Sequence, residues 1–180
     1  MAASEPVAGP SVLVVVATKY GSTREIAAAI VRHLADGGDG RALRLTALLQ
    51  EAEHAPAPTG FDAVLVGSAV YAGRWREPAR DWVSEHAAAL RERPVWLFSS
   101  GPIGPPPFPP DEPYDVHALT QLSGARGHRV FAGRLDKDLL SVGERAMVTA
   151  MRAPLGDFRD WDAVRAWAAE VAAELRDLRC

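Results

Sequence analysis

The chain has 180 residues, of which 48% are hydrophobic and 24% charged, and its formal net charge is −3. This length favours one domain with a sizeable buried core. The slightly acidic net charge gives no indication of binding to nucleic acid or to an anionic membrane surface. The single cysteine, Cys180, cannot form an internal disulfide or a Cys-rich metal site, and this fits a reducing, cytoplasmic location.

The first ten residues are small, contain proline and glycine, and include no basic residue or apolar core. They are therefore predicted to be a flexible tail (1–10) rather than a signal peptide, ahead of a single domain over 11–180. No apolar run reaches the roughly 20 residues of a membrane-spanning helix. The sequence thus predicts a protein that is not transmembrane, and peripheral contact with a membrane stays open.

The first predicted element is a strand over 12–17, a continuous apolar run typical of a strand covered on both faces. The short polar turn Thr18–Thr23 follows. A helix then begins, with an apolar stripe from Ile26 to Leu34 at helical spacing. Ser22 and Glu25, three residues apart, predict a capping box at its start.

The rest of the chain continues the alternation of strands and helices. The predicted elements are an edge strand at 41–45, a connection at 46–60, a strand at 63–67, a loop at 68–75, a helix from 78 to 90, a strand at 95–99, a proline-rich loop at 102–113, a short helix at 114–122, a strand at 129–135, a helix at 138–151 and a last helix capped by Asp160. This order predicts a parallel sheet with helices on both faces.

Three of the predicted loops leave the carboxyl ends of strands, where open α/β sheets bind ligands. They are 18–23, 68–75 and 99–104, and all carry small, hydroxyl or aromatic residues. The first has neither the G-x-x-x-x-G-K-[ST] nor the G-x-G-x-x-G phosphate motif. Its hydroxyls, its glycine and the following helix N-terminus still suit an anion such as a phosphate. On this loop alone, an ordinary strand–helix turn is the alternative.

The pattern Thr18-x-x-Gly21-x-Thr23 after an apolar strand resembles the phosphate loop of flavodoxins. The stretch Gly67–Gly73 is similar to the family's second loop, and Ser99–Gly101 falls at its third. Tyr20 stands where many flavodoxins have threonine. The resemblance implies a flavodoxin-like three-layer α/β sandwich, with a five-stranded parallel sheet in the order 2-1-3-4-5, and FMN as cofactor. A deazaflavin in place of FMN stays open.

In this family the first loop holds the phosphate and the other two flank the flavin ring. Tyr71 is the first choice to stack on the ring and Trp75 the second; packing of both against the body is the alternative. The resemblance implies cofactor contacts from Thr18, Lys19, Tyr20, Gly21, Ser22, Thr23, Ser68, Ala69, Val70, Tyr71, Gly73, Trp75, Ser99, Ser100 and Gly101.

One branch is more similar still, the menaquinone-dependent protoporphyrinogen oxidases. Similarity to it lies in Thr18–Ala27, in the long loop before the last strand, and in Asp160-Trp161 ahead of the final helix. The branch implies transfer of electrons between a substrate and a quinone. The proline-rich loop of this chain differs in composition, so the substrate is not carried over.

Charge and histidine placement add two expectations. Arg74 and Arg76 are predicted near the flavin, where cations raise its potential above that of acidic low-potential carriers. The five histidines show no metal-ligand spacing, although His128 could face the site.

Three functions follow as hypotheses: an FMN-dependent oxidoreductase, a non-enzymatic electron carrier, and a flavin-free interaction module. The first two require a redox partner, which is a quinone, a reductase or a substrate. The sequence indicates no catalytic residue and no oligomeric state.

Overall fold

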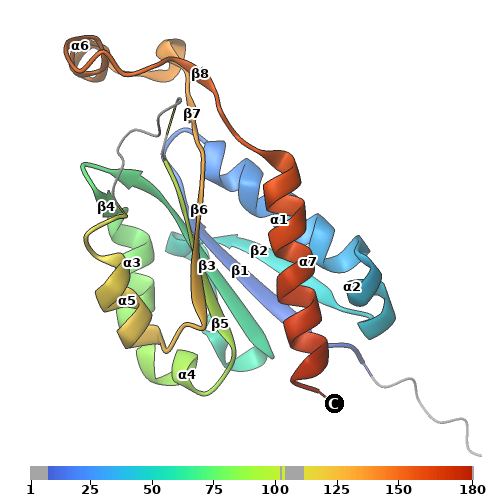
Figure 1. Ribbon diagram of the computed structural model, residues 1–180. Coiled ribbons are helices and arrows are strands. Elements are labelled where there is room, and N and C mark those ends of the chain that lie inside the picture. Colours follow the sequence, from blue (N-terminus) through green and yellow to red (C-terminus); the bar gives the residue numbers. More distant parts are fainter. Residues whose placement is uncertain (1–7, 102, 104–111, 180) are drawn as a thin grey trace, which may run out of the picture.

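The computed structural model describes residues 8–101, 103 and 112–179 (Figure 1). Most of the predicted tail and most of the proline-rich loop at 102–113 lie outside these residues. The expected boundary at residue 11 needs a correction, because Pro10 is buried and its carbonyl accepts a 2.9 Å hydrogen bond from the Thr46 amide. Pro10 therefore packs against the domain.

The predicted parallel sheet is confirmed. Its parallel strands lie in the order β2-β1-β3-β5-β6, which is the predicted 2-1-3-4-5 order. Their bounds are β1 Ser11–Ala17, β2 Thr46–Glu51, β3 Ala63–Tyr71, β5 Val95–Ser100 and β6 Gly127–Phe131. A two-residue strand, β4 (Arg74–Trp75), folds back antiparallel on the end of β3.

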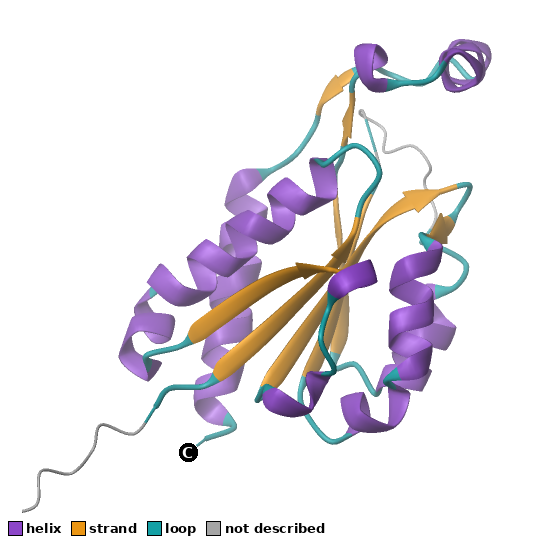
Figure 2. Cartoon of the chain, turned by 180° about the vertical axis from the view of Figure 1, so that it is seen from behind, coloured by secondary structure: helices purple, strands orange, loops and turns teal. Residues whose placement is uncertain are grey.

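Helices cover both faces of this sheet (Figures 1 and 2). One face carries α1 (Ser22–Asp36), α2 (Gly38–Leu43) and α7 (Trp161–Asp177), and the other carries α3 (Glu77–Glu85), α4 (Ala87–Arg91) and α5 (Val116–Ser123). Successive side chains of β1 point to opposite faces, so Val14 joins the core cluster of α1 and α7 whereas Val15 joins that of α3 and α5. Burial on both sides explains the continuous apolar run.

The predicted edge strand at 41–45 is wrong. These residues belong mainly to α2, which ends where Arg44 adopts a left-handed conformation with φ 56°. The edge strand is β2, in the stretch expected to be a connection, and the 3-10 turns η1 (Ala52–His54) and η2 (Pro58–Gly60) follow it. The alternating exposure of β2 explains the error, because a half-exposed edge strand lacks the apolar run that marks a central strand.

A second difference concerns residues 132–160, called here the arm. The predicted strand at 129–135 splits into β6 and β7 (Arg134–Leu135), and β7 pairs antiparallel with β8 (Gly156–Asp157). The predicted helix at 138–151 becomes a 3-10 turn, η3 (Lys137–Leu139), and α6 (Val142–Ala150). Figure 1 shows the arm rising beyond the end of the sheet to which β1 and β3 run. Within the described chain, no residue of α6 is buried.

An aromatic cluster fixes the strand ends beneath the loops. Phe98, Phe131 and Trp167 meet edge to face, with ring centroids 5.6–6.2 Å apart. The Phe98 ring lies so close to β3 that a Cβ on Gly67 would come within 2.0 Å of it. Glycine at this position therefore allows the close packing that holds β3 and β5 in place.

Candidate functional site

A cavity lies at the carboxyl ends of the central strands, where the three predicted loops meet. Among the described residues, nine of those expected to contact a cofactor line it: Thr18, Tyr20, Ser22, Thr23, Ala69, Val70, Tyr71, Ser100 and Gly101. Ile103 and residues of the arm complete the lining, and the arm residues are Gly133, Arg134, Leu135, Asp136, Leu139 and Leu140. Sequence reasoning missed the arm, because its residues match none of the three loops.

The start of α1 forms one wall of the cavity. Gly21 is the N-cap residue and adopts a left-handed conformation with φ 84°, and its amide donates a 3.1 Å hydrogen bond to the Thr18 hydroxyl. The first amides of the helix have no intrahelical acceptor. Together with the helix dipole, they make this wall suitable for an anion.

The predicted capping box at Ser22 and Glu25 is wrong. Ser22 is the first helical residue, so its side chain does not cap the helix. Its Oγ is buried without a hydrogen-bond partner among the described residues. A buried hydroxyl without a partner costs free energy, which a bound acceptor would recover. Ser22 and the buried Thr23 thus present hydroxyls in the wall that a phosphate could use.

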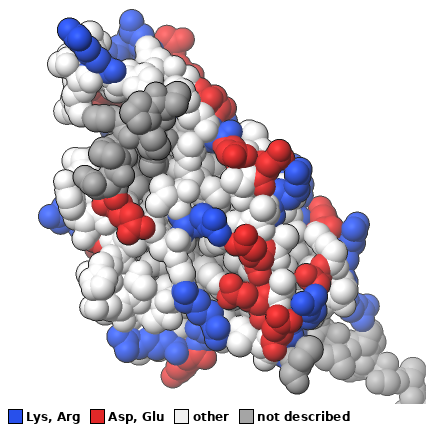
Figure 3. Space-filling view, in the orientation of Figure 1, with Lys and Arg blue, Asp and Glu red and all other residues white. Residues whose placement is uncertain are grey.

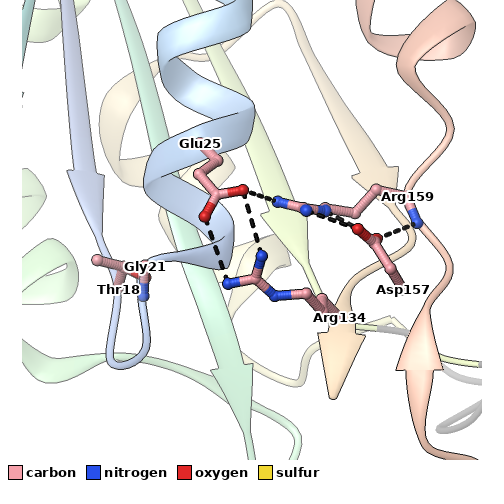
Figure 4. Close-up of polar contacts among 6 residues, drawn as sticks. All are labelled: Thr18, Gly21, Glu25, Arg134, Asp157 and Arg159. Atoms are coloured by element: carbon pink, nitrogen blue, oxygen red, sulfur yellow. Dashed lines mark hydrogen bonds and ion pairs between the residues drawn. The ribbon is translucent and has the colours of Figure 1, made fainter. Parts of the chain in front are cut away.

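Glu25, instead of capping α1, holds the arm to it (Figure 4). Its carboxylate lies 2.6 Å from Nη1 of Arg159 and 3.3 and 3.4 Å from the two terminal nitrogens of Arg134. Arg159 also binds Asp157, at 2.7 Å. The hydrogen bonds from Arg159 lower the pKa of both carboxyls, so the cluster is charged at neutral pH.

A second link joins residues of the first loop to α6. The Lys19 ammonium and the Tyr20 hydroxyl both donate to the carboxylate of Glu144. The hydrogen bond from Lys19 is the largest cause that lowers the pKa of Glu144, and the same contact raises the pKa of Lys19. Glu144 also closes a capping box with Ser141 at the start of α6. The side chain of Lys19 is thus directed to the arm.

Tyr71 lines the cavity and lies near two cations. Its side chain is 40% exposed, with Lys19 Nζ 5.5 Å and Arg76 Cζ 6.0 Å from the ring centroid. Burial raises the pKa of the Tyr71 phenol above its ordinary value. Arg76 therefore lies near Tyr71, whereas Arg74 is exposed on β4. Tyr71 therefore offers an accessible aromatic surface in a cationic setting.

A family model of the flavodoxin domain matches residues 13–162. The chain belongs to the flavodoxin domain family. A flavodoxin from the domain Archaea has a TM-score of 0.61 at 14% identity, covering 92% of this chain and 99% of that one. A Streptococcus pneumonia TIGR4 flavodoxin has a TM-score of 0.60 at 18% identity, covering 91% and 99%.

The fold also matches part of a larger protein. The rubredoxin oxygen:oxidoreductase of Desulfovibrio gigas has a TM-score of 0.62 at 12% identity, covering 93% of this chain but 36% of that one. No curated protein matches the sequence. These comparisons support the flavodoxin family and do not support the narrower protoporphyrinogen oxidase branch.

Some residues predicted to contact the cofactor of this flavodoxin domain are buried beneath the cavity. Trp75 is 2% exposed and its indole donates a 2.8 Å hydrogen bond to Ser99. Ser68 is fully buried and its Oγ accepts from the Arg76 amide. Trp75 therefore packs the second loop against the body, and the expectation that it could stack on a ring is wrong. Gly73 forms the turn of the β3–β4 hairpin with φ 73°.

His128, which could have faced the site, is turned into the body of this flavodoxin domain. Its Nε2 lies 2.7 Å from the Ser99 hydroxyl and its Nδ1 lies 3.3 Å from Glu112. Burial lowers its pKa, and the contact with Glu112 opposes that shift.

Across the described residues, no group of three or more His, Cys, Asp or Glu side chains could hold a metal. No helix in the same part of the chain is long and apolar enough to cross a bilayer.

Proposed function

We propose that the protein binds FMN in this cavity and transfers electrons between redox partners. The Ser22 hydroxyl carries the proposal, because it is buried without a hydrogen-bond partner among the described residues and lies beside Gly21 and Thr23, in the loop that resembles the family's phosphate loop. The Thr18–Thr23 loop would hold the phosphate, with Tyr71 against the ring. Bound FMN would supply the electron-accepting chemistry. The single cysteine supports a cytoplasmic location.

Absorbance of the purified protein and uptake of added FMN test this proposal. Ser22→Ala removes one hydroxyl and should weaken FMN binding about tenfold, since a hydrogen bond to a charged group contributes roughly 1.5 kcal/mol. Ser84→Ala is the matched control, because the Ser84 hydroxyl bonds only the Arg80 carbonyl on an exposed part of α3. Wild-type protein that neither carries nor takes up a flavin would leave an interaction module as the function.

We further propose an oxidoreductase acting between a substrate and a quinone or protein acceptor, as in the protoporphyrinogen oxidase branch. Three cations support it, since Lys19, Arg76 and Arg134 lie at or beside the cavity and would stabilise a reduced, anionic flavin. The reduction potential should exceed that of low-potential carriers. A potential as low as theirs, with no menaquinone reduction by a porphyrinogen, would instead make this protein an electron carrier.

A further inference from the structure

Arg134 is a cation that the arm brings into the wall of the cavity. It lines the same cavity as Thr18, Ser22 and Thr23, although it lies more than a hundred residues further along the chain. Figure 4 shows its guanidinium turned toward Glu25, in the first turn of α1. Strand β7 fixes this position, because Arg134 pairs with Asp157 of β8. The charge of Arg134 therefore reaches the start of α1 from the arm.

The hold of Glu25 on Arg134 is loose. Its carboxylate binds Arg159 at 2.6 Å, whereas both contacts to Arg134 are 3.3 Å or longer. The side chain of Arg159 is 4% exposed and also bound to Asp157, whereas that of Arg134 is 25% exposed. Glu25 thus keeps a close partner if Arg134 turns away, and Arg134 is free to bind another anion.

A cation at this wall would strengthen the binding of a phosphate dianion. The backbone amides and hydroxyls of the first loop carry no net charge, and the nearby Glu25 carboxylate repels an anion. Lys19, the cation of the loop itself, is engaged by Glu144. A guanidinium presents parallel N–H donors that match two phosphate oxygens.

We propose that Arg134 binds the phosphate of the flavin and makes the site prefer FMN over riboflavin. The proposal rests on the proposed function, since it requires a flavin in this cavity. Arg134 is then a specificity-determining residue supplied by the arm, and it exchanges its loose contact with Glu25 for one with the ligand.

The test is a titration of apoprotein with FMN and with riboflavin, followed by quenching of flavin fluorescence. Arg134→Gln should weaken FMN binding about tenfold or more and leave riboflavin binding unchanged, because a charged hydrogen bond is lost only with FMN. Added salt should weaken FMN binding less in this variant than in the wild type. Arg129→Gln is the matched control, since Arg129 pairs with Glu170 away from the cavity, and it should change neither affinity.

A second variant should change the ratio of FMN to riboflavin affinity in the opposite direction. It keeps the proposal testable even if Arg134→Gln does not fold. Glu25→Gln removes the repelling carboxylate and frees Arg134, so it should raise the ratio of FMN to riboflavin affinity severalfold. If Arg134→Gln weakens the binding of FMN and of riboflavin equally, or leaves the ratio of the two affinities unchanged, the role of Arg134 is overturned, although FMN binding itself stands. A lower ratio of FMN to riboflavin affinity in Glu25→Gln would overturn the role of Arg134 as well. Wild-type protein that binds no flavin would instead remove the proposed function.

Discussion

Individual residues at the start of α1 decide whether the first loop can bind an anion. The threonine and serine hydroxyls of this loop were predictable from the motif, and Thr18, Ser22 and Thr23 do line one cavity. For Ser22 the sequence also predicted a competing helix-capping contact, because Ser-x-x-Glu is the sequence of a capping box. The left-handed backbone at Gly21 starts the helix one residue earlier than that box requires.

Replacing Gly21 tests this backbone geometry. Gly21→Ala should lower the free energy of unfolding by about 1 kcal/mol, because a side chain at φ 84° is strained even though no atom lies within 4 Å of the new Cβ. Gly60→Ala is the control, at an equally open glycine without a positive φ, and should be neutral or slightly stabilising. Urea unfolding measures both. Equal effects of the two substitutions would contradict the strain at Gly21.

Among the elements, the arm distinguishes this domain from a bare sandwich of sheet and helices. Its β7–β8 hairpin leaves the parallel sheet, and α6 buries no side chain among the described residues. A nine-residue helix without a buried face is marginal on its own. Its capping box and the contacts of Glu144 to Lys19 and Tyr20 therefore determine its position.

Substitution of Glu144 tests this dependence. Glu144→Gln keeps a residue that can form the capping box but removes the charge that binds Lys19. Because an exposed ion pair is lost, the backbone amides of α6 should exchange with solvent about two- to fivefold faster. Hydrogen exchange read by mass spectrometry measures this. Glu170→Gln, which breaks a pair outside the arm, should leave α6 unchanged. Unaltered exchange in Glu144→Gln would show that other contacts hold α6.

At the scale of the whole molecule, two apolar clusters on opposite faces of one sheet hold the fold together. On the face shown in Figure 3, Lys and Arg are interspersed with Asp and Glu rather than separated by sign. His128, by contrast, is a titratable residue whose side chain is largely buried. Its contact with the Ser99 hydroxyl links β6 to β5.

The free energy of unfolding should fall on mild acidification because of His128. Its folded pKa lies below the unfolded value of about 6.5, so the unfolded chain binds the proton first. Stability is therefore complete above pH 6.5 and falls, by at most about 1.4 kcal/mol per pH unit, until the pH passes the folded pKa. His128→Gln should lack this component, whereas the exposed His54→Gln should retain it. Urea titrations at several pH values measure the slope, and parallel slopes for wild type and His128→Gln would contradict the assignment.

The amino-acid sequence by itself determined the central parallel strands and the three loops that meet at their carboxyl ends, and the resemblance to flavodoxins supplied the strand order. Buried parallel strands leave an unbroken apolar run, and right-handed crossovers leave few ways to order them. The edge strand β2 escaped prediction because a half-exposed strand has no such run.

Only the tertiary structure decided which residues complete the site. Trp75 turned inward because the β3–β4 hairpin places its indole against Ser99. Arg134 reached the start of α1 because β7 leaves the sheet to pair with β8, a contact between residues far apart in sequence. The periodicity of a sequence indicates which face of an element is buried, but it does not indicate which distant segment packs against that face.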